Sequence, residues 1–167
     1  MADELRRYAL AALFGAGRRE LVEHIPHCVR LGMEVLHVGP HVARVRLPYR
    51  EEIVGDPVRR VVFGGAITTL LDHAGGLAVF ASLPDLASIA TLDLRIDYLR
   101  AAAPGHDLVG EATCYRLTTH VAFVRASAWE VRAEDPFATC LATFMVGANP
   151  SLSPVARAVR DREGGAG

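Results

Sequence analysis

The sequence predicts an α+β fold in which one long, curved antiparallel sheet wraps around a central buried helix. Two observations support this class. The predicted elements run in the order helix, two strands, helix, four strands within one chain of 167 residues. The second helix, over about residues 65–82, is apolar on nearly all sides, which is typical of a buried helix. A single antiparallel sheet can cover such a helix by curving around it.

The first half of the chain is expected to form a helix and a hairpin. Residues 3–23 show an amphipathic helical pattern, and residues 1–29 form the predicted N-terminal helical segment. Residues 33–38 and 42–47 read as two strands around Gly39-Pro40, which is a hairpin signal. Residues 48–60 are polar and contain Gly55-Asp56-Pro57, so we expect a loop there.

The second half is expected to form the central helix and four strands. Gly75-Gly76 weakens the helix by roughly 1 kcal/mol per glycine, so we expect a neighbouring backbone to approach it closely. The strands are predicted over residues 89–99, 108–117, 121–131 and 137–146. The first of them alternates, with Leu92, Leu94, Ile96 and Tyr98 on one face and Thr91, Asp93, Arg95 and Asp97 on the other. Residues 30–147 form the predicted main domain. Residues 148–167 form a tail in which a short helix over 154–162 is expected.

Composition narrows the function classes. Half of the residues are apolar (51%) and the net charge is -1, which predicts a globular protein and gives no support to a bulk nucleic-acid or anionic-membrane binder. Cys28, Cys114 and Cys140 are far apart and form no CxxC pair, so we expect no disulfide framework, no metal site and a cytoplasmic location. Asp3 and Glu4 argue against a secretory signal peptide, and no apolar run is long enough to span a membrane.

The segment from Val61 to Asp72 carries the strongest functional signal. Gly64-Gly65 begins the apolar helix, and glycines allow backbone amides to approach a ligand closely. The start of a helix presents free N–H groups and favours negative charge, so this segment is an oxyanion site in outline. Asp72, later in the same helix, is costly to bury without a partner or a function. The structural alternatives are a simple helix start and an acid satisfied by its neighbours.

These residues resemble the hotdog-fold acyl-CoA thioesterases, the group that includes the phenylacetic-acid-degradation thioesterases, over roughly residues 30–147. The family motif is His-Gly-Gly followed by an Asp or Glu nine residues after the His, and Phe63-Gly64-Gly65 with Asp72 keeps that spacing. The strand at 91–99 with Pro104-Gly105 downstream also matches. The resemblance implies the hotdog fold, hydrolysis of acyl-CoA with no cofactor beyond the coenzyme A of the substrate, and a site shared across a homodimer.

The resemblance also implies a role for each motif residue. The amides at Gly64 and Gly65 would hold the oxyanion, and Asp72 would act as general base on water or as direct nucleophile. Thr91 matches the position of a hydroxyl that orients the water or the acid. Asp56 and Pro57 fall near the family's common Asn or Gln, at the substrate, and neither is an amide.

Two further departures from the family pattern matter. Phe63 replaces the His that helps to fix geometry near the thioester, and Arg60 replaces a Gly shortly before it. A phenyl ring forms no conventional hydrogen bond, but it can line an apolar acyl site. The oxyanion donor is a backbone N–H, so it survives both changes.

Three further residues are candidates for substrate contact. His73 either orients Asp72 or faces solvent. Arg100 and Arg125, like Arg95, would suit coenzyme A phosphates, or they belong to a solvated strand face.

The spacing of the motif predicts an assembly. At 1.5 Å per residue, Gly64 and Asp72 stand roughly 12 Å apart along one helix, so a single carbonyl cannot easily meet both. Two antiparallel helices at a two-fold axis would place Gly64 of one protomer opposite Asp72 of the other. We therefore expect an obligate homodimer, which could pair further into a tetramer.

Three function classes remain. The first is an acyl-CoA thioesterase. The second is a non-catalytic acyl-CoA binder, which the replacement of the motif His by Phe63 favours. The third is a hotdog hydratase or dehydratase, which ranks low because no His follows Asp72 at the spacing of that chemistry; Gly76 and Leu77 occupy the region. The sequence does not identify the acyl group.

Overall fold

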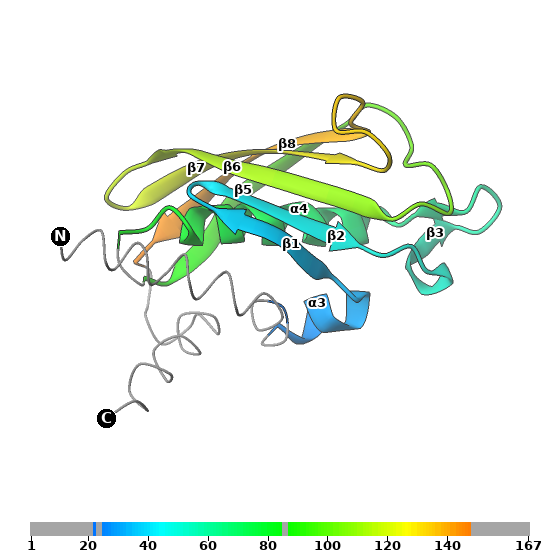
Figure 1. Ribbon diagram of the computed structural model, residues 1–167, viewed down its shortest axis with the longest axis horizontal. Helices are drawn as coiled ribbons and strands as arrows, with labels where there is room; N and C mark the ends of the chain where they lie inside the picture. Colours follow the sequence, from blue (N-terminus) through cyan, green and yellow to red (C-terminus); the bar gives the residue numbers. More distant parts are fainter. Residues whose placement is uncertain (1–21, 23–24, 85–86, 148–167) are drawn as a thin grey trace.

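The computed structural model describes Val22, residues 25–84 and residues 87–147 (Figure 1). The helix predicted over residues 3–23 lies outside these residues except for Val22, which is helical and buried. The tail from residue 148, with its expected short helix, lies outside them entirely.

One six-stranded antiparallel sheet dominates the described residues, with the strand order β1-β2-β6-β7-β8-β5. The strands are β1 Glu34–Gly39, β2 Val42–Leu47, β5 Ile89–Tyr98, β6 Leu108–Leu117, β7 Val121–Trp129 and β8 Ala138–Val146. Alternation made these strands predictable, because one face of each packs on the core: β8, for example, alternates buried Ala138, Cys140, Ala142 and Phe144 with more exposed residues. The predicted ends differ from these by a few residues at most.

The central helix α4, Gly64–Phe80, lies against the concave side of this sheet (Figure 1). Eleven of its 17 residues are buried, which explains why its sequence is apolar on nearly all sides. A short helix, α3 Pro26–Leu31, lies on the side of α4 away from the sheet. It runs across the predicted boundary at residues 29 and 30, and it ends at Gly32, whose φ of 67° is left-handed. The architecture is the predicted α+β class.

The segment at residues 48–60, predicted as a loop, contains more structure than expected. A 3₁₀ turn, η1 Glu51–Ile53, leads into β3 Val54–Asp56, which pairs with β4 Val61–Val62 as a small second sheet. Both strands are shorter than a recognisable alternation, so the pattern alone could not identify them.

The expected backbone contact at Gly75-Gly76 is wrong. A Cβ at Gly75 would lie 3.1 Å from the ring of Phe144 and 3.6 Å from Val124, so the close neighbours are side chains. The tighter contact between helix and sheet lies at Gly110 in β6, where a Cβ would stand 2.9 Å from Cγ of Leu70. The absence of a side chain at Gly110 therefore lets α4 lie close to the middle of the sheet.

A β-bulge changes the predicted faces of β5. Thr91 pairs with Phe144 and Asp93 pairs with Thr143, so Leu92 is an extra residue in the ladder and is half exposed. Leu94, Ile96 and Tyr98 pair with Ala142, Cys140 and Ala138, which are buried on the same face of β8 as Phe144. Thr91 therefore faces α4 together with Leu94, Ile96 and Tyr98, and its predicted assignment to the opposite face is wrong.

We expect Gly110→Ala to lower the free energy of unfolding by about 1–3 kcal/mol, because the added methyl group would overpack the fully buried Leu70. Urea denaturation of the variant beside the wild type measures this change. Shortening the neighbour by Leu70→Val in the same chain should recover part of the loss. Equal stability of Gly110→Ala and the wild type would contradict the close packing of α4 on β6.

Candidate active site

The first turn of α4 presents two free backbone amides. Phe63 is the N-cap residue and has no side-chain hydrogen bond to the helix. Its carbonyl accepts from Ala66 N–H at 3.0 Å and from Ile67 N–H at 3.4 Å. Among the described residues nothing accepts from the N–H groups of Gly64 and Gly65. The helix start can therefore bind an oxygen that carries negative charge.

Phe63 lies against Gly65 on one side and Gly55 on the other, and both positions have room for it only because they are glycine. A Cβ at Gly65 would be 2.5 Å from Cε1 of Phe63, and a Cβ at Gly55 would be 2.9 Å from its Cα. Phe63 N–H donates to the carbonyl of Ile53 at 2.8 Å, which fixes the backbone. The ring is nevertheless 62% exposed, so it forms an apolar wall open to a ligand or to another chain.

Asp72 lies two turns further along α4, beside β5. Thr91 Oγ1 donates to Asp72 Oδ1 at 2.8 Å, and the bulge at Leu92 is what turns Thr91 toward the helix. Burial raises the pKa of Asp72 above its ordinary value, and the hydrogen bond from Thr91 opposes that rise. Asp72 is thus a partly buried carboxyl with one fixed hydroxyl partner, as a general base requires. The predicted juxtaposition of Asp72 and Thr91 is present.

Two buried thiols lie in the electrostatic field of Asp72. Burial, with a smaller contribution from the charge of Asp72, raises the pKa of Cys28 and of Cys140 to about 11. Both remain neutral thiols at ordinary pH and, like Cys114, are buried. Cys114 and Cys140 thus fill the core between helix and sheet.

Asp56 shapes the β3–β4 turn. Its Oδ1 accepts from the N–H groups of Val58 and Arg59, both at 3.0 Å, and these bonds hold the pKa of the carboxyl below its ordinary value. This is the local turn chemistry typical of aspartate. Its proximity to substrate stays a prediction.

Arg60, at the position of the family glycine, has a left-handed φ of 57°. Only glycine adopts such a backbone without strain, which gives a physical reason for glycine there in relatives. Arg60 is held by an ion pair with Glu51 and by a hydrogen bond from Tyr49 Oη to its carbonyl at 3.2 Å.

His73 points into the core. It is 9% exposed, and burial lowers its pKa to about 4, so the ring is neutral at ordinary pH. The alternative that it faces solvent is therefore wrong. No hydrogen bond joins it to Asp72, and its Nε2 is buried without a partner among the described residues. Its predicted role at the substrate stays a prediction.

The structure places Arg100 in a network away from the helix start. Its guanidinium donates to both carboxylate oxygens of Glu130 at 2.7 and 2.8 Å and to the Asp135 carbonyl at 3.0 Å. The side chain of Glu130 is only 3% exposed. Arg100 thus ties the end of β5 to the turn after β7, and a contact with coenzyme A stays a prediction.

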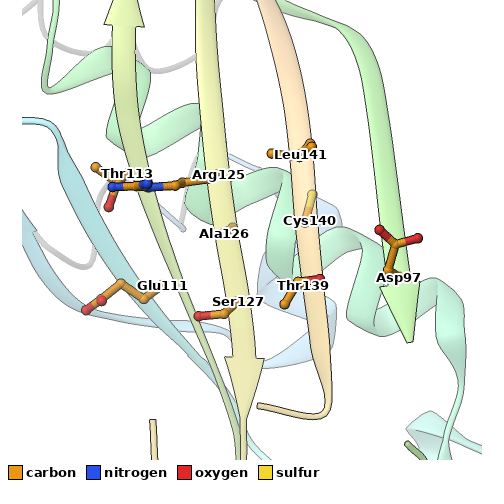
Figure 2. A pocket seen from close by; sticks show the side chains of 9 residues that line it. All are labelled: Asp97, Glu111, Thr113, Arg125, Ala126, Ser127, Thr139, Cys140 and Leu141. Atoms are coloured by element: carbon orange, nitrogen blue, oxygen red, sulfur yellow. The ribbon is translucent and has the colours of Figure 1, made fainter. Parts of the chain in front are cut away.

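Arg125 lies on the face of the sheet away from α4. Figure 2 shows it extending across β6 toward Thr113 while α4 passes behind the strands. With Asp97, Glu111, Ser127 and Leu141 it lines a shallow hollow of about 380 Å³, and it stacks 6.0 Å from the ring centre of Tyr115. The sheet separates this hollow from Asp72, so within one chain Arg125 cannot serve the same site.

Tyr98 is the site residue that sequence analysis missed. It was predicted only as part of an apolar strand face, yet its hydroxyl donates to the Gly64 carbonyl at 3.3 Å. The alternation placed it correctly on the face with Leu94, but no pattern indicates which hydroxyl reaches the start of a distant helix.

In the part of the chain that the structure describes, no three His, Cys, Asp or Glu side chains gather as a metal site would need. Nor is any helix of the described residues both long and apolar enough to cross a bilayer.

Comparisons with known proteins give this geometry a family context. Residues 60–135 match the model of the thioesterase superfamily, and this range contains β4, α4, β5, β6 and β7. A protein of Halobacterium salinarum with esterase in its name is 38% identical over 100 residues, which are 58% of this chain and 65% of the relative. The chain thus spans just under two thirds of that relative. A medium/long-chain acyl-CoA thioesterase of Escherichia coli, YigI, is 29% identical over 75% of this chain and 88% of its own.

Solved structures agree with the fold. A Pseudomonas aeruginosa protein is 41% identical with a TM-score of 0.70, and the match covers 80% of this chain and 98% of the other. The phenylacetic acid degradation protein PaaI of Thermus thermophilus, solved as a point mutant, is 25% identical with a TM-score of 0.63, over 72% of this chain and 97% of its own. The predicted hotdog architecture is confirmed.

We expect Thr91→Val to move the titration of the Asp72 carboxyl to higher pH. The variant removes the hydrogen bond that lowers this pKa and leaves burial, which raises it. Carboxyl ¹³C NMR of labelled aspartate measures the titration, and the signal missing from Asp72→Asn identifies the residue. Thr113→Val, on the opposite face of the sheet, is the matched control and should leave the titration unchanged. An Asp72 titration that stays in place or moves to lower pH in Thr91→Val would contradict the assignment.

Proposed function

This chain belongs to the thioesterase superfamily, and from that premise we propose that it is an acyl-CoA thioesterase with an apolar acyl specificity. The observation that carries the proposal is the Thr91–Asp72 hydrogen bond on the same helix as the free Gly64 and Gly65 amides. Asp72 would activate the water, and the Gly64 and Gly65 amides would hold the oxyanion. The family prediction made from the motif is confirmed by these comparisons, and the roles of the residues are what we propose.

The proposed reaction uses Asp72 as a general base. Asp72 takes a proton from water as the water oxygen bonds to the thioester carbon, and the carbonyl oxygen becomes an oxyanion on the Gly64 and Gly65 amides. The oxyanion then collapses, the carbon–sulfur bond breaks, and the thiolate of coenzyme A takes the proton. The products are a carboxylic acid and free coenzyme A thiol. A direct attack by Asp72 on the carbonyl, followed by hydrolysis of the acyl-enzyme, is the alternative.

A homodimer paired through β5 would complete this site. In the described residues β5 pairs only with β8, so no described strand pairs with its other edge, and Leu92 and Tyr98 of the same strand are half exposed. A ten-residue edge strand with exposed apolar side chains is a natural site for pairing with a second chain.

Two side-chain hydrogen bonds made by β5 determine which groups of the two copies such a pairing would bring together. Thr91 holds Asp72 near one end of the strand, and Tyr98 holds Gly64 near the other end, on the same face. Antiparallel pairing of two copies about a centre at Arg95, with Leu92 as the extra residue, would place Thr91 of one copy beside Tyr98 of the other. Asp72 of one protomer would then approach Gly64 of its partner, which answers the roughly 12 Å separation within one helix.

The apolar ring of Phe63 supports the acyl preference. It lies beside the proposed oxyanion amides and is exposed to a ligand. It offers dispersion and apolar area but no hydrogen bond. The medium/long-chain acyl-CoA substrate in the name of the Escherichia coli relative agrees with such a wall.

A non-catalytic acyl-CoA binder is the second candidate, and Phe63 is the observation that favours it. The free amides and the apolar wall would still bind a thioester, while the missing His would slow or abolish turnover. The test of the proposed function is therefore release of free thiol from short, medium, long-chain and aryl acyl-CoAs, beside binding of the same compounds by calorimetry. Binding without release from any of them would select the binder.

We expect Asp72→Asn to keep the fold and to lower kcat by a factor of roughly 100 or more, because it removes the general base. Gly65→Ala should also be impaired, since its methyl group would displace the Phe63 ring that now lies 2.5 Å from the Cβ position. Refolding the two defective chains together tests whether sites are shared. If they are, half of the dimers are hybrids with one intact site each, and about a quarter of wild-type activity returns.

No recovery in the mixture, with hybrid dimers demonstrated by differently tagged chains, would place both groups of each site in one protomer and contradict the shared-site mechanism. A mixture of two preparations of Asp72→Asn is the control for recovery caused by refolding alone.

We expect Phe63→His to raise kcat, because an imidazole can form the hydrogen bonds near the thioester that a phenyl ring cannot. Steady-state thiol release with the best substrate of the panel measures the change. Phe63→Leu keeps an apolar side chain and should give no increase. A kcat that stays the same or falls in Phe63→His, in a protein that still binds acyl-CoA, would show that the rest of the site is arranged for phenylalanine.

A further inference from the structure

Two side-chain hydroxyls converge on one carbonyl at the start of α4. Tyr98 Oη, from β5, donates to the Gly64 carbonyl at 3.3 Å, and Thr68 Oγ1, one turn further along α4, donates to the same oxygen at 3.0 Å. Tyr98 also fits closely against the glycine, since a Cβ at Gly64 would lie 3.3 Å from its hydroxyl oxygen. The first carbonyl of the helix thus has two donors in addition to the helical hydrogen-bond ladder.

The Gly64 carbonyl and the Gly65 N–H are parts of one peptide group. Hydrogen bonds to a carbonyl oxygen draw electron density through the conjugated peptide bond, so the N–H of the same group becomes a stronger donor. The Gly65 N–H is one of the two free amides of the proposed oxyanion site. Hydroxyls that donate to the Gly64 carbonyl would therefore strengthen the binding of an oxyanion by the Gly65 N–H.

We propose that Tyr98 and Thr68 are positioning residues that fix and polarise the Gly64–Gly65 peptide for oxyanion binding. The inference rests on the proposed function, and it adds two residues that neither the motif nor the sequence pattern indicated. Neither side chain needs to touch the substrate. Both act through the Gly65 N–H, which gains strength as the oxyanion forms.

The next peptide of the helix shows why the effect is specific. Thr69 Oγ1 donates to the Gly65 carbonyl at 2.9 Å, so Thr69 polarises the Ala66 N–H in the same way. That N–H already donates to the Phe63 carbonyl at 3.0 Å and is not available to a ligand. The hydroxyl of Thr68 therefore acts on an amide that is free to bind a ligand, whereas the hydroxyl of Thr69 acts on an amide that is already bonded. Thr69 is thus a matched control for Thr68.

The kinetic test compares Tyr98→Phe and Thr68→Val, which each remove one hydroxyl and keep the shape of the side chain. We expect each to lower kcat for acyl-CoA hydrolysis roughly threefold to tenfold with little change in KM, because the lost interaction strengthens only as charge develops. Thr68→Ser keeps the hydroxyl and should retain the wild-type kcat. Thr69→Val and Tyr115→Phe, the latter a similarly exposed tyrosine on the other face of the sheet, should also retain it.

A second measurement reads the peptide itself and does not depend on turnover. In protein labelled with ¹⁵N-glycine, we expect the Gly65 amide nitrogen to move to lower chemical shift in Tyr98→Phe and Thr68→Val and to stay in place in Thr69→Val and Tyr115→Phe. Gly65→Ala identifies the signal. A wild type that hydrolyses no acyl-CoA would refute the proposed function, and the Gly65 signal would then decide the polarisation alone. An unmoved Gly65 signal, or a moved signal with unchanged kcat in an active enzyme, would overturn the inference.

Discussion

The burial of one almost wholly apolar helix by a single sheet is the constraint on which the rest of the structure depends. Leu70, Leu71, Ala74 and Ala78 are at most 1% exposed, and the sheet must curve to cover them. His73 is buried under that cover as a neutral ring, whereas the groups of the proposed site lie where the cover ends. The first turn, with Gly64 and Gly65, and the side that faces the edge strand β5, with Asp72, are such places. The chemistry of the proposed site is thus confined to the margin of the core, where a substrate can reach it and where desolvation still raises the pKa of Asp72.

Much of this arrangement could be predicted, because it follows from periodicity. Alternation identified the long strands, and the nearly uniform apolarity of α4 identified it as buried. The features that could not be predicted depend on contacts between distant segments. The extra residue at Leu92 shifts the alternation of β5 by one position, so a strict alternation placed Thr91 on the wrong face of the sheet. The role of Thr91 beside Asp72 was predicted from the family motif and not from that alternation. Tyr98 fits the pattern as an apolar-face residue, and only the packing of β5 on the helix start shows that its hydroxyl has a partner. The short β3 and β4 carry too few residues for any period.

The replacement of the motif His by Phe63 is supported by the residues around it. Gly55 and Gly65 both leave the space that the ring occupies, and the Ile53 carbonyl holds its backbone. The residue at the helix N-cap has therefore changed in chemistry while the helix start has kept its geometry. Asp56 and Arg60, which stand where the family pattern has an amide and a glycine, are engaged in the turn that carries Phe63. The departures from the family motif thus fall in one local unit, the β3–β4 hairpin and its connection to α4, and they leave the Thr91–Asp72 pair untouched.

The edge strand β5 links assembly to chemistry. Its two inward hydroxyls each hold one functional element of α4, Asp72 through Thr91 and the Gly64–Gly65 peptide through Tyr98. The edge of β5 that no described strand pairs with is where a second copy would pair. A shift of β5 along that edge would move both hydroxyls together, and with them the acid and the oxyanion donor. Pairing of two copies would consequently do more than bring the two half-sites together. It would also fix the strand from which each half-site takes its geometry, so a protomer on its own would lack both the partner group and the rigid support for the group it contributes.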